Sequence, residues 1–130
     1  MVPIPVAVGR WLCERVLIEQ GTTNPSLIAA FTGLGVEQFP ARPLPFSVFS
    51  TLTDAEGQGT ISLRFNSLES GEMIYRSDRG ILVSDRLTTV NVHFRVERVV
   101  FPEAGFYEVS LHVDDDLVTA RRLRVHLLGD

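Results

Sequence analysis

Apolar and polar residues alternate one by one along much of this chain. Val90, Val92, Phe94 and Val96 are each followed by a polar or charged residue. A period of two puts successive side chains on opposite faces of a strand, so this segment predicts a β-strand with one buried face. The same alternation occurs at 61–66 and at 107–114. We therefore expect the dominant structure to be β-sheet.

Other segments carry weaker forms of the same signal. Four of them are rich in β-branched or aromatic residues and predict further strands, at 11–18, 45–52, 73–76 and 117–127. Two shorter strands are expected at 27–31 and 81–83, although Asn24 and Pro25 could equally begin one helical turn. Sequences that favour turns separate these segments, at 21–24, 54–57, 77–80 and 114–116. Seven to nine short strands at this spacing predict an all-β sandwich or barrel.

The segment that contains Gly105 and Tyr107 refines the architecture. Residues 103–107 are an acidic residue, any residue, glycine, any residue and tyrosine, in that order. This order resembles the tyrosine corner of immunoglobulin-like domains. The resemblance implies an immunoglobulin-like antiparallel β-sandwich of seven to nine strands, in which both residues are structural. Val109 stands where such domains place a cysteine, and the chain holds one cysteine, Cys13, so no intrachain disulfide can form.

The last strand contains a change of phase. Val118 and Ala120 share one phase, whereas Leu123 and the apolar residues after it share the other. One extra residue, a β-bulge, near Arg121 and Arg122 would return both sets to the core.

The whole chain resembles a group of uncharacterised bacterial proteins built as a single immunoglobulin-like sandwich. The resemblance rests on packing and turn motifs, namely LCERV at 12–16, SLIAAF at 26–31, FP at 39–40 before FSVF at 46–49, and FPEAGFY at 101–107. It implies the fold and the source, and it carries no activity or binding residues.

Composition limits the chemistry. The chain has 130 residues, 45% hydrophobic and 22% charged, as expected for one globular domain with its own core. We find no repeat or linker, so we expect a single domain over 1–130, in which 1–9 could form an extended arm. The chain has no lysine, which excludes a Walker A loop and a pyridoxal Schiff base. The net charge of −4 argues against nucleic-acid binding.

Location and reactivity follow from the same composition. No basic residue precedes the apolar N-terminal segment, and no apolar run is long enough to span a bilayer. A lone cysteine fits a reducing compartment, so we expect a cytoplasmic protein without membrane contact. Cys13 is expected to be an inert thiol. We expect no cofactor, no catalytic residue and no enzymatic activity. If the protein is an enzyme after all, the class left open is a hydrolase whose site the sequence does not reveal.

Two acidic loops form the candidate metal site. In an immunoglobulin-like topology, the loop with Asp54 and Glu56 lies at the same end as the loop with Asp114, Asp115 and Asp116. Carboxylates from neighbouring loops are ligands that calcium uses. The alternative is that these acids are ordinary turn residues exposed to solvent. The three histidines fall in the polar phase of their strands and are expected to face solvent.

Residues out of phase are the candidates for recognition. Phe49 and Phe106 fall in the polar phase of their strands, Trp11 lies in a first strand expected at a sheet edge, and Arg121 and Arg122 flank the predicted bulge. Edge strands and exposed aromatic patches are common docking sites. The alternative, equally open, is that the N-terminal segment and residues 27–34 fold over these side chains and cover them.

We therefore expect a non-catalytic interaction or scaffold module that acts through an edge strand or an aromatic patch, on an unknown protein or on a second copy of itself. The alternative is a sandwich that holds calcium or carbohydrate at the acidic loops.

Overall fold

The computed structural model describes residues 6–18, 25–85 and 87–129. The predicted turn at 21–24 lies outside these ranges. The described residues form nine β-strands, which are β1 (Val6–Ile18), β2 (Pro25–Phe31), β3 (Gly33–Val36), β4 (Phe46–Thr53), β5 (Gly57–Ser67), β6 (Met73–Val83), β7 (Val90–Val96), β8 (Gly105–Val113) and β9 (Asp116–Leu127). Within the same ranges, no helix has the length and hydropathy needed to cross a membrane.

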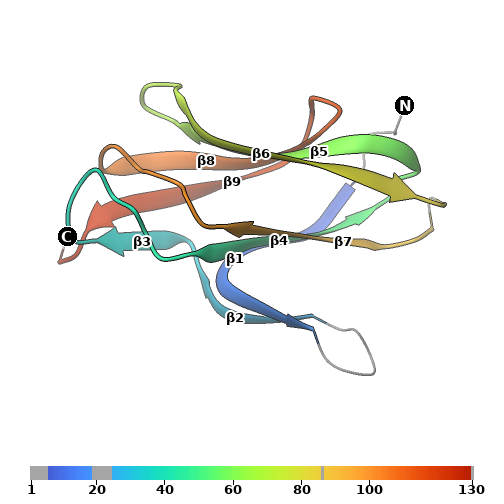
Figure 1. Cartoon of the computed structure of the whole chain (residues 1–130), viewed down its shortest axis with the longest axis horizontal. Helices are drawn as coiled ribbons and strands as arrows, with labels where there is room; N and C mark the ends of the chain where they lie inside the picture. Colours follow the sequence, from blue (N-terminus) through green and yellow to red (C-terminus); the bar gives the residue numbers. More distant parts are fainter. Residues whose placement is uncertain (1–5, 19–24, 86, 130) are drawn as a thin grey trace.

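The strands form two sheets (Figure 1). The four-stranded sheet has the order β2-β1-β4-β7, and the five-stranded sheet has the order β3-β9-β8-β5-β6. Neighbouring strands are antiparallel, except that β3 runs parallel to β9. The chain passes from one sheet to the other between β2 and β3, at Thr32. This is the all-β, immunoglobulin-like sandwich that the sequence predicts.

The core lies between the two sheets, as the alternation predicts. Phe65 of β5 is fully buried at its centre, and its ring contacts Phe46, Tyr75 and Phe101 at centroid distances of 6.0, 5.4 and 6.1 Å. The apolar phases of β4, β7 and β8 surround this cluster. Each buried aromatic or aliphatic side chain of this size stabilises the fold by about 1.5–3 kcal/mol.

Tyr107 anchors the beginning of β8. Its hydroxyl donates a hydrogen bond to the carbonyl oxygen of Glu103 at 2.6 Å, and its ring meets Phe101 edge to face at 4.9 Å. Gly105 has a φ of +147°, a conformation that side chains disfavour. This is the geometry of a tyrosine corner, and it fixes where β8 begins.

Seven of the nine predicted strands each correspond to one observed strand, but the prediction for 73–83 is wrong. The sequence 77–80 was expected to form a turn between two short strands, whereas β6 continues through it from Met73 to Val83. Its residues pair one by one with β5, for example Ser77 with Leu63 and Gly80 with Thr60. Pairing with the buried strand β5 outweighs the local turn preference of these residues.

Three other local predictions differ from the structure. Residues 6–9 belong to β1 rather than to an arm. Gly33 and Gly35 lie in β3, a strand that the sequence does not predict, because pairing with β9 compensates for low strand propensity. The β8–β9 register shifts between Leu111 and His112, so the extra residue is Val118 and the predicted bulge position is wrong.

The tyrosine corner gives a test of the fold. Tyr107→Phe keeps the ring and its contact with Phe101 but removes the hydrogen bond to Glu103. We expect the free energy of unfolding to fall by about 1 kcal/mol in urea titrations. Tyr75→Phe is the matched control, since the Tyr75 ring also packs on Phe65 and its hydroxyl has no such bond. Equal losses in the two variants would contradict the assigned role.

Candidate interaction surface

The edges of the two sheets differ in how they are protected. Each sheet ends in two strands with one unpaired side, which are β2 and β7 in one sheet and β3 and β6 in the other. Unpaired strands invite pairing with another chain, and proteins protect them by shortness, proline, charge or cover. β3 has four residues, and β2 begins with Pro25, which has no N–H group. β6 has eleven residues and no proline.

Arg79 covers part of the β7 edge. Although it lies in β6, its guanidinium donates a hydrogen bond to the carbonyl oxygen of His93 in β7 at 2.7 Å. The same guanidinium lies over the Phe94 ring, 4.5 Å from the centroid. Arg79 therefore bridges the edges of the two sheets and shields the core between them. A carbonyl that a second chain could have used on β7 is already bound.

The backbone of β6 faces the open side at alternate residues. Thr60 of β5 uses both of its backbone groups toward the β8–β9 turn: its carbonyl oxygen accepts from the Asp114 N–H at 2.9 Å, and its N–H donates to the Asp114 carboxylate at 2.9 Å. Thr60 lies opposite Gly80, so the N–H and C=O of Gly80 point away from β5. Because backbone orientation alternates along a strand, the N–H and C=O groups of Asp78 and Leu82 also point away from β5.

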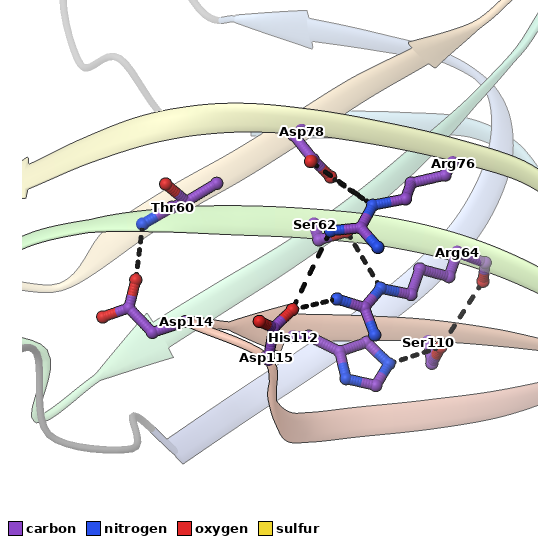
Figure 2. A network of polar contacts seen from close by, with 9 residues as sticks. All are labelled: Thr60, Ser62, Arg64, Arg76, Asp78, Ser110, His112, Asp114 and Asp115. Carbon is purple, nitrogen blue, oxygen red and sulfur yellow. Dashed lines mark hydrogen bonds and ion pairs between the residues drawn. The ribbon is translucent and has the colours of Figure 1, made fainter.

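The polar side chains next to this edge form a connected network on the outer face of the five-stranded sheet (Figure 2). Within β6, the Arg76 Nε donates to Asp78 at 3.0 Å. In β5, the mostly buried Arg64 side chain donates to the Asp115 carboxylate at 2.7 Å. Arg76 also lies 3.8 Å from that carboxylate. Asp115, at the tip of the β8–β9 turn, therefore holds guanidinium groups from two adjacent strands.

The network fixes the charges along β6. The hydrogen bond from Arg76 lowers the pKa of Asp78, and a hydrogen bond from Ser62 adds to this effect. The same contact with Asp78 raises the pKa of Arg76. Both side chains are exposed and charged at neutral pH, and each stands next to one of the outward-facing backbone groups. The edge therefore presents a defined charge pattern together with its free hydrogen-bonding groups.

His112 lies beneath this network. Its Nε2 is 3.0 Å from the Ser110 hydroxyl, whereas its Nδ1 is buried without a hydrogen-bond partner. Burial, and next the Arg64 guanidinium, lower the pKa of His112. The backbone and carboxylate of Asp115 oppose this shift to a smaller extent. The ring is thus held neutral inside a polar layer.

The predicted calcium ligands are not gathered into one site. No group of three or more His, Cys, Asp or Glu side chains in the described ranges is placed to hold a metal ion. Asp114 and Asp115 are occupied by Thr60 and Arg64. Asp54, Asp114 and Asp115 have φ values of 61°, 49° and 70°, typical of tight turns. Glu56 and Asp116 are exposed. These positions give the calcium hypothesis no support.

The predicted interaction residues are also scattered. Phe49 is only 3% exposed, so its prediction as a surface residue is wrong. It lies on β4, which is paired on both sides, and its register partners are Trp11 of β1 and His93 of β7. Phe106 is 47% exposed and lies under Arg122, 5.4 Å from the guanidinium. Arg121 pairs with Val109 on the core side of its sheet. Trp11 lies on β1, which pairs with both β2 and β4, so the expectation that this strand is at a sheet edge is wrong. The Trp11 side chain lies outside what the structure describes.

A groove that the sequence does not predict lies beside β3. It has a volume of about 1090 Å³ and is lined by β3, by Glu14 and Arg15 of β1, by the end of β2 and by the loop 37–45. Arg95 of β7 at its wall donates to the Glu14 carbonyl of β1 and to Ser47 of β4, which links three strands of the four-stranded sheet. Three segments far apart in sequence build this groove, so no local motif could have indicated it.

The low pKa of His112 gives a pH test. The pKa is near 6.5 in an unfolded chain and lower in the folded protein, so the unfolded state binds more protons as the pH falls below about 6.5. His93, whose pKa burial and then Arg79 lower, acts in the same direction. We expect stability in urea to drop from pH 7.5 to 5.5, and less so in His112→Asn. An equal drop in the variant would contradict this origin.

Comparison with other proteins places the chain in a family. Residues 10–126 match a family of unknown function, DUF6941. Among solved structures, an immunoglobulin-like protein (PA1606) from Pseudomonas aeruginosa is 14% identical, with a TM-score of 0.42 over 93% of this chain and 95% of that chain. None of the curated proteins gives a significant match. The chain therefore belongs to the DUF6941 family of unknown function.

Proposed function

We propose that this protein is a non-catalytic interaction module, and that a partner adds a strand to the open edge of β6. The observation that supports the proposal is the length and regularity of this edge. β6 pairs along its whole length with β5, and it presents free N–H and C=O groups at alternate residues on its other side. In strand addition, such main-chain groups provide the affinity and neighbouring side chains provide the specificity.

An edge strand accounts for the surface better than an aromatic patch does. Phe106 is half exposed and Phe49 is buried, and single exposed apolar residues are ordinary on protein surfaces. Leu82, by contrast, is 80% exposed on the open strand itself. An added strand would lie beside this part of β6 and would pair with its free backbone groups.

The polar network supports a non-catalytic role. Its charged groups, Arg64, Arg76, Asp78 and Asp115, are bound to one another, and a set of this kind fixes strand positions. Cys13 is fully buried, and burial raises the pKa of its thiol, which disfavours the reactive thiolate. A buried single thiol suits a reducing compartment, so the proposed location is the cytoplasm.

Site-specific crosslinking tests the proposal. A photoreactive phenylalanine analogue replaces Leu82 on β6, and in a matched protein it replaces Leu117, which is 55% exposed at the start of β9. After irradiation in producing cells, we expect a discrete adduct from position 82 and none from position 117, because the partner is proposed to pair with β6 and not with β9.

A second variant tests whether the adduct depends on the backbone N–H groups of the β6 edge. Gly80→Pro removes an N–H that points to the open edge, and a Cβ at Gly80 meets no atom within 4 Å, so pairing with β5 is preserved. The adduct from position 82 should disappear in this variant while its thermal unfolding stays cooperative. An adduct that persists, or equal adducts from positions 82 and 117, would overturn the proposal.

A further inference from the structure

We infer that the strand accepted by β6 is the β6 strand of a second copy of this chain, paired antiparallel about a two-fold axis at Ser77. This inference rests on the proposed function of the β6 edge and names its occupant. β6 is the last strand of the five-stranded sheet, and its free side faces away from β5. Two copies joined there would form one continuous ten-stranded sheet.

Backbone geometry restricts the registers that such a pair can adopt. Only residues with the same backbone orientation can lie opposite each other in an antiparallel ladder. Because the orientation alternates along β6, a symmetric pair must be centred on a residue and not between two residues. The central part of β6 therefore offers five candidate centres, which are the residues 76 to 80.

Charge selects one of these five centres. Centring on Gly80 would put Asp78 opposite the apolar Leu82 and would leave the charges of Arg76 and Asp78 without a partner across the axis. Centring on Arg76, Asp78 or Arg79 puts that residue opposite its own copy, with like charges face to face, which is destabilising. Centring on Ser77 puts a small uncharged residue at the axis. It also puts Arg76 of each copy directly opposite Asp78 of the other, so both flanking pairs join opposite charges. The charges of β6 in one copy are therefore complementary to those of β6 in the second copy.

The hydrogen-bonding pattern fits the same centre. Arg76 and Asp78 have the same backbone orientation as Gly80, toward the open edge, so each Arg76–Asp78 pair can exchange two N–H···O=C bonds. Ser77, whose backbone groups face β5, becomes a non-hydrogen-bonded pair with Cα atoms about 4.5 Å apart. A small side chain suits this close approach. The regular ladder ends near Ile74, where the β5–β6 register shifts.

The charges act chiefly through specificity. Exposed ion pairs contribute little free energy, and Arg76 and Asp78 already contact each other within one chain. Like charges brought together at an interface cost more than unlike pairs gain. Reversing one charge should therefore weaken association strongly, whereas reversing both should restore it.

Charge exchange between two variants tests the inference. Analytical ultracentrifugation of the full chain should show a dimer of twice 14.5 kDa. Asp78→Arg alone and Arg76→Asp alone should each dimerise at least about tenfold more weakly, since each brings like charges together. An equimolar mixture of the two should form a heterodimer, because every 76–78 pair across the axis then joins opposite charges. Loss of the Arg76–Asp78 contact within one chain could not produce this recovery.

A cysteine variant checks the register. Ser77→Cys should form an intermolecular disulfide on mild oxidation, because position 77 meets its own copy across the axis. Gly80→Cys is the control and should not, since Gly80 would lie opposite Ile74. The native Cys13 is buried and does not compete.

The outcomes separate this inference from the proposed function. A dimer that survives both single charge reversals, or a mixture that fails to recover, would overturn the inference. A monomeric chain with the position-82 adduct to another protein would overturn it and leave the edge proposal standing. A monomer without that adduct would overturn both.

Discussion

The pairing of β5 on both of its sides is the constraint on which the rest of the structure depends. β5 lies between β6 and β8, and its apolar face carries Phe65 at the centre of the core. The orientation of Thr60 toward Asp114 sets which β6 backbone groups are used by β5 and which remain open. The core, the polar network and the free edge are therefore three consequences of one strand's register.

The sheet margins show how unevenly this protein protects its edges. Arg79 binds the β7 carbonyl of His93 and shields Phe94, so one charged side chain blocks an edge and closes the sandwich. β3 is short. Within the described residues, β6 is neither short nor bound by a side chain from another strand along its open side, and its protection comes from charge, at Arg76 and Asp78. These charges would repel most hydrophobic strands, which limits nonspecific association.

The alternation along the sequence predicted the strands that have one buried face, because core burial dictates that pattern directly. It failed at 77–80, where serine, aspartate, arginine and glycine favour a turn. An edge strand is exposed on one face and only partly covered on the other, so polar residues cost little there. Pairing with β5 then decides the structure, and that pairing joins positions too far apart in sequence to be recognised.

The candidate site shows the same limit. The sequence predicted correctly that β4–β5 and β8–β9 are linked by acidic turns, but not that Asp115 would hold Arg64 and Arg76, since that contact requires the register of three strands. Phe49 was predicted to be exposed because it falls in the polar phase of its strand. The exposure of that face of β4 also depends on what the rest of the fold places next to it, which local alternation does not reveal.

The segment 77–80 links the failed prediction to the inferred function. A polar stretch can remain a strand at the edge only while its charges are compatible with what lies beside it. Arg76 and Asp78 alternate in sign around the neutral Ser77, so a copy in one register is compatible and copies in neighbouring registers are not. The polarity that makes this sequence look like a turn is then also what makes its pairing selective.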